Sequence, residues 1–310
     1  MNRGGRWIAS AAVILLVAWA AMKVDWPAAL AVLRHASPAV VALAIVVNLL
    51  SVMLRGLRWW IFLRRAGAVP LAVAVRGAIV GSGFNNLLVA NGGDAARALL
   101  VSRAAGLSRS TTVATLALDR LFDPVCFGLL LLIGTFVVPL PAALAHSQPI
   151  VAGVLLLVIG LLVLLARARP PETDPSVVIV GWRATRRAFR QQLAHLSTAR
   201  RFGAAMSVSA GIWALQVGVF ALAARSVGLA LPIAGSIAAM LLTNAGLILR
   251  ATPGNIGYFQ FAYALAASRF GVPNTAGVAA ALLLQMVQIV PVTLLALILA
   301  PRMVEGRKNQ

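Results

Sequence analysis

Residues 85–94 read Asn85-Asn86-Leu87-Leu88-Val89-Ala90-Asn91-Gly92-Gly93-Asp94 and form a polar, glycine-bearing break in apolar sequence. A second break, over residues 250–257, reads Arg250-Ala251-Thr252-Pro253-Gly254-Asn255-Ile256-Gly257. Lipid cannot satisfy the hydrogen bonds of broken backbone, so such segments persist at membrane depth only where protein buries them or a wet cavity solvates them. Two breaks in corresponding parts of one chain point to the substrate site of a membrane transporter.

The composition agrees with a membrane protein. Of the 310 residues, 61% are hydrophobic and 11% are charged, which predicts an all-α, polytopic membrane protein with no soluble catalytic domain. The net charge of +20 comes almost entirely from arginine. We attribute it to cytoplasmic loops and contacts with lipid phosphate, and not to nucleic-acid binding. The single cysteine and three separated histidines have no metal-ligand spacing, so we expect no metal or cofactor.

Apolar length and arginine counts place the spans. We predict six full spans and two re-entrant helical hairpins, the spans at 7–23, 38–62, 110–138, 149–166, 204–224 and 274–300, and the hairpins at 71–105 and 233–270. This arrangement puts both termini in the cytoplasm of a bacterial inner (plasma) membrane. An alternative, which the charge distribution does not exclude, treats the hairpin arms as full spans.

The chain is predicted to be one transmembrane domain, residues 1–310, that contains an inverted-topology repeat. Ser102-Arg103 aligns over Ser268-Arg269, and the same register sets Asp119 over Gln285. The repeat halves are 38–166 and 204–301, separated by a basic cytoplasmic loop over 167–203. Each half has a broken helix pair followed by a long helix, as inverted repeats of transporters do. Chance similarity between membrane helices is the alternative.

Three carboxylates lie at membrane depth, where each needs a partner or a wet cavity: Asp94, Asp119 and Asp123. Asp94 starts the second half-helix of the first hairpin, and Arg97 follows three residues later on the same face. One interpretation is a helix cap with a stabilising salt bridge. The other is a lipid phosphate held by Arg97 at a helix N-terminus.

Asp119, Arg120 and Asp123 lie about ten residues into a span, on the order of 15 Å deep at 1.5 Å per residue. Asp119 and Asp123 share a face, and Arg120 reaches Asp123 at i,i+3. The triad either holds helices together or lines a headgroup path, with a proton-coupling carboxylate as a variant of the second interpretation. Arg55 and Arg58, near a span end, are expected only to snorkel.

The second break is predicted to free backbone amides at Pro253, Gly254 and Gly257 beside Arg250, which makes an anion site. Gln285 and Gln288 are interpreted as interhelical hydrogen-bonding residues. The full set of predicted substrate-binding residues is Asn85, Asn86, Asp94, Arg97, Asp119, Arg120, Asp123, Arg250, Pro253, Gly254 and Gly257.

These motifs resemble the flippase-like integral membrane family typified by the transmembrane region of lysylphosphatidylglycerol synthase. The resemblance rests on four segments: Arg55-Gly56-Leu57-Arg58-Trp59, Asn85-Asn86 with Gly93-Asp94 and Arg97, Asp119-Arg120 with Asp123, and Pro253-Gly254-Asn255-Ile256-Gly257-Tyr258-Phe259. Gln260 and Gln285 depart from it, because Glu and Arg are common there in the family. Both departures lower the polarity of the second repeat.

The resemblance implies a lipid flippase or transporter that moves an anionic or modified lipid, such as a phospholipid, a polyprenyl phosphate or a hopanoid-type lipid. We expect membrane lipids as partners, with envelope-lipid biosynthetic enzymes as further candidates. The soluble aminoacyl-transfer domain of the family is absent from this sequence, so we expect the chain not to be an enzyme. Two alternatives stay open, a membrane-embedded lipid-modifying transferase and a noncatalytic scaffold of an envelope-biosynthesis complex.

Overall fold

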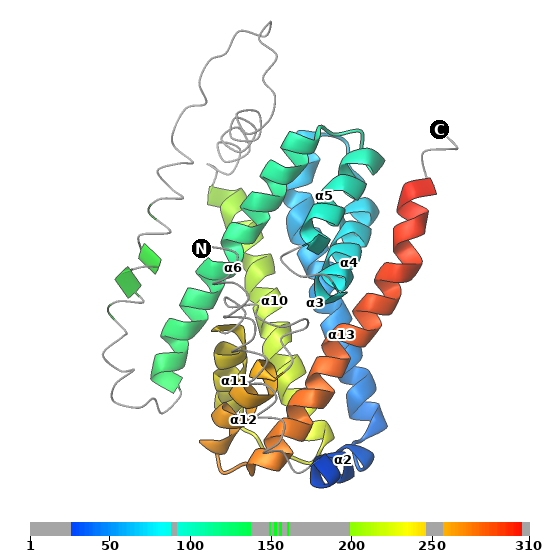
Figure 1. Cartoon of the computed structure of the whole chain (residues 1–310). Helices are drawn as coiled ribbons and strands as arrows, with labels where there is room; N and C mark the ends of the chain where they lie inside the picture. The colour runs from blue at the N-terminus through cyan, green and yellow to red at the C-terminus, as the bar shows by residue number, and fades with distance from the viewer. Residues whose placement is uncertain are drawn as a thin grey trace, which may run out of the picture. The chain divides into compact units, whose positions relative to one another are not determined.

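The computed structural model describes residues 26–87, 92–137, 199–245 and 257–305, with a few isolated positions between 149 and 160. Throughout these residues the chain is helical and has no strand, which confirms the predicted all-α class (Figure 1). In chain order the helices are α2 (Trp26–Arg34), α3 (Pro38–Ala66), α4 (Leu71–Leu87), α5 (Gly92–Ala104), α6 (Arg109–Val137), α10 (Ala199–Ser226), α11 (Ile233–Ala245), α12 (Tyr258–Ser268) and α13 (Asn274–Glu305).

Within the described residues, three helices are long and apolar enough to cross a bilayer: α3, α10 from Phe202, and α13. Their outward side chains are apolar and well exposed, as lipid-facing residues are; Val46, Met286 and Leu294 are examples. The chain is therefore a multi-pass membrane protein. The predicted count of six spans stays a prediction, because the span at 7–23 and most of 149–166 lie outside the described residues, as does the loop 167–203 apart from 199–203, which begin α10.

The described part of the first break is helical. Asn85 and Asn86 belong to the last turn of α4, and Gly92, Gly93 and Asp94 belong to the first turn of α5. Residues 88–91 between these two turns lie outside the described residues. In the second break, 246–256 lie outside the described residues and include Arg250, Pro253 and Gly254.

Contacts divide the chain into two compact units. Unit 1 comprises Met1–Leu50, Asn85–Gly92 and Ala214–Leu294, and unit 2 comprises Ser51–Phe84, Gly93–Trp213 and Leu295–Gln310. Helices α3, α10 and α13 contribute residues to both. These units are defined by contacts, whereas the predicted halves 38–166 and 204–301 are defined by a sequence repeat that stays a prediction.

Unit 2 is held together by aromatic packing and by close approach of helix backbones. A Cβ atom on Gly56 would lie 2.6 Å from the Cα of Val75, so glycine is what lets α3 and α4 touch. The rings of Phe62 and Phe122 lie 5.7 Å apart, and those of Phe122 and Phe202 lie 5.6 Å apart. This packing fixes the helices that carry the charged residues described below.

Unit 1 is held together by uncharged amides around a proline. Pro291 lies inside α13 and has no N–H to donate to the carbonyl of Val287, four residues earlier. The side chain of Asn48 supplies the missing donor, with Nδ2 at 3.2 Å from that carbonyl oxygen. Gln216 donates to Asn48 at 3.4 Å, and Gln288 donates to Gln216 at 3.1 Å. The amides join α3, α10 and α13, which is the interhelical role predicted for Gln288.

Candidate functional site: a buried charge network

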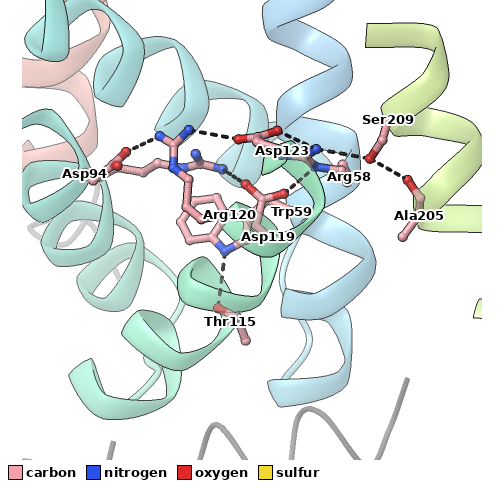
Figure 2. Close-up of polar contacts among 10 residues, drawn as sticks. Arg58, Trp59, Asp94, Thr115, Asp119, Arg120, Asp123, Ala205 and Ser209 are labelled. Atoms are coloured by element: carbon pink, nitrogen blue, oxygen red, sulfur yellow. Dashed lines mark hydrogen bonds and ion pairs between the residues drawn. The ribbon is translucent and has the colours of Figure 1, made fainter. Parts of the chain in front are cut away.

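Arg58 of α3 lies at the centre of a charge network in unit 2 (Figure 2). Its Nε donates to Asp119 Oδ1 at 2.8 Å, and its Nη1 lies 2.8 Å from Asp123 Oδ1 and 3.0 Å from Ser209 Oγ. Asp119 and Asp123 are one turn apart on α6, so a single guanidinium bridges them. Arg58 and Asp119 are each only 1% exposed, and a buried pair of this kind depends on the hydrogen bonds that its charged groups make.

Arg120 extends the network to α5. It pairs with Asp123 at 3.4 Å, as its i,i+3 spacing predicts, and it also pairs with Asp94. The sequence predicted Arg97 as the partner of Asp94 and did not anticipate its ion pair with Arg120 across the α5–α6 interface. The reason is packing: the side chain of Arg97 is drawn into the core of unit 2, and that of Arg120 is about one third exposed beside Asp94.

Arg97 carries the guanidinium of the network whose hydrogen-bonding capacity is least satisfied. Its side chain is 3% exposed, and its Nη2 lies 3.6 Å from Asp119 Oδ2, which is too long for a hydrogen bond. Its guanidinium lies over the ring of Trp59, 3.9 Å from the centroid. Within the described residues, Nε and Nη2 of Arg97 find no hydrogen-bond partner, and neither does Asp119 Oδ2. The Arg97 guanidinium is therefore held in place while its Nε and Nη2 keep unused hydrogen-bond donors.

Glycines on α4 leave the space that the aliphatic part of the Arg97 side chain occupies. A Cβ atom on Gly81 would lie 2.9 Å from both Cβ and Cδ of Arg97. One on Gly77 would lie 2.5 Å from Val101 Cγ2 and 3.2 Å from the ring of Trp59. The Trp59 indole is itself fixed, because its Nε1 donates to Thr115 Oγ1 at 3.2 Å. The stem of Arg97 thus packs against a glycine face, and its charged head stacks on an immobilised ring.

The formal charges of the network do not cancel. Arg55 of α3, partly buried, lies within electrostatic range of Asp119 and Asp123. Among the described residues, four guanidinium groups (Arg55, Arg58, Arg97 and Arg120) face three carboxylates (Asp94, Asp119 and Asp123), which leaves one positive charge in excess. An uncompensated charge at membrane depth is costly.

The structure brings five of the predicted site residues into one network, Asp94, Arg97, Asp119, Arg120 and Asp123. The sequence interpretation missed three others, Arg55, Arg58 and Trp59. Arg55 and Arg58 were expected to snorkel, but Arg58 is 1% exposed and lies beside Trp59, which is 0% exposed. A signal was available, because three carboxylates at membrane depth need more cationic partners than Arg97 and Arg120 provide.

The other predicted site residues fall in unit 1 or outside the described residues. Asn86 Nδ2 lies 3.3 Å from Thr293 Oγ1 of α13, which groups the end of α4 with unit 1. The amide of Gly257, predicted as a free anion donor, instead donates to Gln260 Oε1 at 2.7 Å. Gln260 competes successfully for that amide because it lies three residues into α12, where a side chain can reach back to cap the helix.

A family comparison identifies the class of this protein. Residues 6–296 match the model of the lysylphosphatidylglycerol synthase TM region, which covers nearly the whole chain. The chain therefore belongs to this family, and the resemblance inferred from its motifs is confirmed.

One curated relative adds an enzymatic association. Over 111 residues the chain is 36% identical to Glycosyltransferase AglD of Haloferax volcanii, a match that covers 36% of this chain and 18% of that protein. The chain thus spans less than a fifth of the relative that it matches. The expectation that this protein is not an enzyme is contradicted, because the relative is named as an enzyme and the family carries the name of a synthase. Together the comparisons define a lipid-related membrane protein.

Proposed function

We propose that this protein binds the anionic headgroup of a membrane lipid at Arg97 and moves that lipid between the leaflets of a bacterial inner membrane. The observation that carries the proposal is the state of Arg97, which is 3% exposed and keeps two nitrogens without a hydrogen-bond partner among the described residues. A buried donor left unpaired costs about 1–3 kcal/mol. A ligand that accepts these hydrogen bonds removes that cost, so the site is prepared for an acceptor.

The ligand chemistry follows from charge and shape. The network carries one excess positive charge, and a phosphodiester carries one negative charge at neutral pH. The planar fork of arginine matches two phosphate oxygens. Trp59 covers one face of the Arg97 guanidinium, so a ligand approaches through the edge that carries the unused donors. Asp119 Oδ2 lies 3.6 Å from Arg97 Nη2, so it attracts that edge of the guanidinium without accepting a hydrogen bond from it.

A gradient of exposure within the network supports movement of the headgroup. Asp94, Arg120 and Asp123 are 19%, 37% and 33% exposed, whereas Arg58, Asp119 and Arg97 are at most 3% exposed. We infer that the headgroup is first met at the exposed end and then passed to Arg97. The acyl chains stay in lipid while the α4–α5 and α11–α12 hairpins rock. Cytoplasmic placement of both termini is part of the same proposal.

Leaflet exchange tests this function. Vesicles of phosphatidylcholine that contain the protein and a fluorescent phosphatidylglycerol should exchange the probe between leaflets faster than protein-free vesicles. Arg97→Gln should slow the protein-dependent rate by about 10–100-fold, since a hydrogen bond to a charged group contributes about 1.5–3 kcal/mol. Arg103→Gln is the matched control, because Arg103 is exposed near the end of the same helix, and it should retain the rate. Equal rates for Arg97→Gln and the wild type would refute the proposal.

A second candidate function is lipid modification by glycosyl transfer. It is favoured by the name of the relative, a glycosyltransferase, and by the presence of Asp119 and Asp123 as candidate bases beside the proposed headgroup site. In this function the network holds an anionic lipid acceptor while a sugar is transferred. The test is incubation of the purified protein with polyprenyl phosphate and a radiolabelled nucleotide sugar. Product that depends on the wild type and is lost in Asp119→Asn supports it; no product counts against it.

A further inference from the structure

Arg55 is an arginine inside a membrane helix whose charge has no close partner. It lies about 17 Å from the C-terminal end of α3 at about 1.5 Å per residue. Among the described residues it makes no hydrogen bond or ion pair, although it lies within electrostatic range of Asp123. Asp123 is shared by Arg58 and Arg120, at 2.8 Å and 3.4 Å. An ionisable side chain at membrane depth marks a functional site by default.

Trp213 of α10 carries an unpaired donor in the same unit. Its ring packs against Phe127 of α6, with ring centroids 5.9 Å apart. Its Nε1 is buried and has no hydrogen-bond partner in the part of the chain that the structure describes. By contrast, the Nε1 of Trp60 donates to the carbonyl oxygen of Val69 at 2.8 Å. A buried indole N–H usually has such a partner, so the Trp213 donor is open to an acceptor from a ligand.

Helices α3 and α10 run antiparallel where they touch in unit 2. Arg58 Nη1 donates to Ser209 Oγ at 3.0 Å. Leu54, one turn before Arg58 in α3, faces Gly211, which follows Ser209 in α10. A Cβ atom on Gly211 would lie 3.5 Å from Leu54 Cδ1. A step back along α3 therefore corresponds to a step forward along α10.

One turn from the contact of Arg58 with Ser209, both helices carry the unpaired groups. Arg55 lies three residues before Arg58, so the two share a face of α3. Trp213 lies four residues after Ser209, so these two share a face of α10. Because the helices are antiparallel, both steps lead the same way along unit 2. Arg55 and Trp213 therefore lie at one level, about 5 Å further from the C-terminal end of α3 than the contact, and Phe127 places α6 beside them.

These two side chains suit a phosphate oxygen. A guanidinium and an indole N–H can donate hydrogen bonds but cannot accept them. A ligand for the pair must supply acceptors and negative charge, as a phosphodiester does, and Arg97 calls for the same chemistry. The ring of Trp59, on which the Arg97 guanidinium stacks, is one turn from Arg55 on the same face of α3. A phosphate that leaves Arg97 thus meets Arg55 one turn further along α3.

We propose that Arg55 and Trp213 form a second headgroup site, which receives the lipid phosphate from Arg97 on its way between the leaflets. The inference rests on the proposed function, because it adds a step to the movement of the same lipid. Arg97 captures the phosphate, and Arg55 with Trp213 stabilises it after it has left Arg97. Loss of the second site should therefore leave capture intact and slow the transfer.

The test separates lipid binding from leaflet exchange. Exchange of fluorescent phosphatidylglycerol is measured in phosphatidylcholine vesicles that contain the full chain, and binding of phosphatidylglycerol is measured by native mass spectrometry of the detergent-solubilised protein. Arg55→Gln should slow the protein-dependent exchange by about 10–100-fold and Trp213→Phe by about fivefold, as expected for a charged and a neutral hydrogen bond. Both variants should bind phosphatidylglycerol as the wild type does. Arg97→Gln should weaken binding and slow exchange together.

Trp60→Phe is the matched control, because it is the same substitution at an indole whose N–H is already bonded. It should exchange the lipid at the wild-type rate, and a rate as low as that of Trp213→Phe would overturn the second site. Wild-type exchange in Arg55→Gln or in Trp213→Phe would also overturn it and leave the proposed function standing. Loss of phosphatidylglycerol binding in Arg55→Gln would show that Arg55 and Arg97 form one site, against the inference. A wild type that speeds no exchange would remove both proposals.

Discussion

Gly81→Ala should displace Arg97 without removing any charge. The added Cβ would lie 2.9 Å from Cβ and Cδ of Arg97, closer than real Cβ contacts. Overpacking of this kind costs about 1–3 kcal/mol. The glycine-to-alanine change by itself favours a helix by about 0.5–1 kcal/mol. We therefore expect a net destabilisation between about 0 and 2.5 kcal/mol, together with a loss of anionic lipid binding because the unused donors of Arg97 move.

Gly211→Ala is the control for this prediction. Its Cβ would meet Leu54 Cδ1 at 3.5 Å, an ordinary van der Waals distance, so it should gain the helical stabilisation without strain. Thermal unfolding in detergent should place Gly81→Ala below Gly211→Ala by about 1–3 kcal/mol. Phosphatidylglycerol binding should fall only in Gly81→Ala. If both variants unfold alike and bind the lipid as the wild type does, the space left by Gly81 does not position Arg97.

Three further predictions concern stability and are read by thermal unfolding. Asn48→Leu should cost about 1–3 kcal/mol of stability because it leaves the buried Val287 carbonyl unpaired. The cost should be smaller in a Pro291→Ala background, where the N–H of residue 291 can donate to that carbonyl. Equal costs in both backgrounds would contradict this prediction. Arg58→Met should lower the free energy of unfolding by about 3–5 kcal/mol, and adding Asp119→Leu should recover part of that loss. Additive losses in the double variant would show that the pair is not coupled. Trp59→Phe keeps a ring under Arg97 but loses one hydrogen bond, so it should cost about 0.5–1.5 kcal/mol and preserve anionic lipid binding; lost binding would make the indole N–H essential to the site.

The sequence predicted the helices well because membrane helices are marked by apolar length and by charged or glycine-bearing ends. It also predicted that Asp119 and Asp123 act together, since helical spacing alone puts them on one face. Contacts inside one helix are local, and local spacing is visible in a sequence.

Contacts between helices were harder to predict from the sequence. The pairing of Arg58 with Asp119 joins residues 61 positions apart, and nothing in the local pattern of α3 distinguishes a buried arginine from one that snorkels. The ion pair of Asp94 with Arg120 was missed for the same reason, because i,i+3 spacing points only to Arg97 whereas helix packing brings Arg120 of another helix within reach. The amide of Gly257 was expected to be free because the reach of Gln260 back to its own helix start was not considered.

The most direct test of the Arg97 site is the lipid that copurifies with the protein. Mass spectrometry of the wild type and of Arg103→Ala should identify the same phosphate-bearing lipid, bound at about one per protein, and the same measurement on Arg97→Ala should find it lost. An anionic lipid retained in full by Arg97→Ala, or a wild type that carries none, would contradict the account.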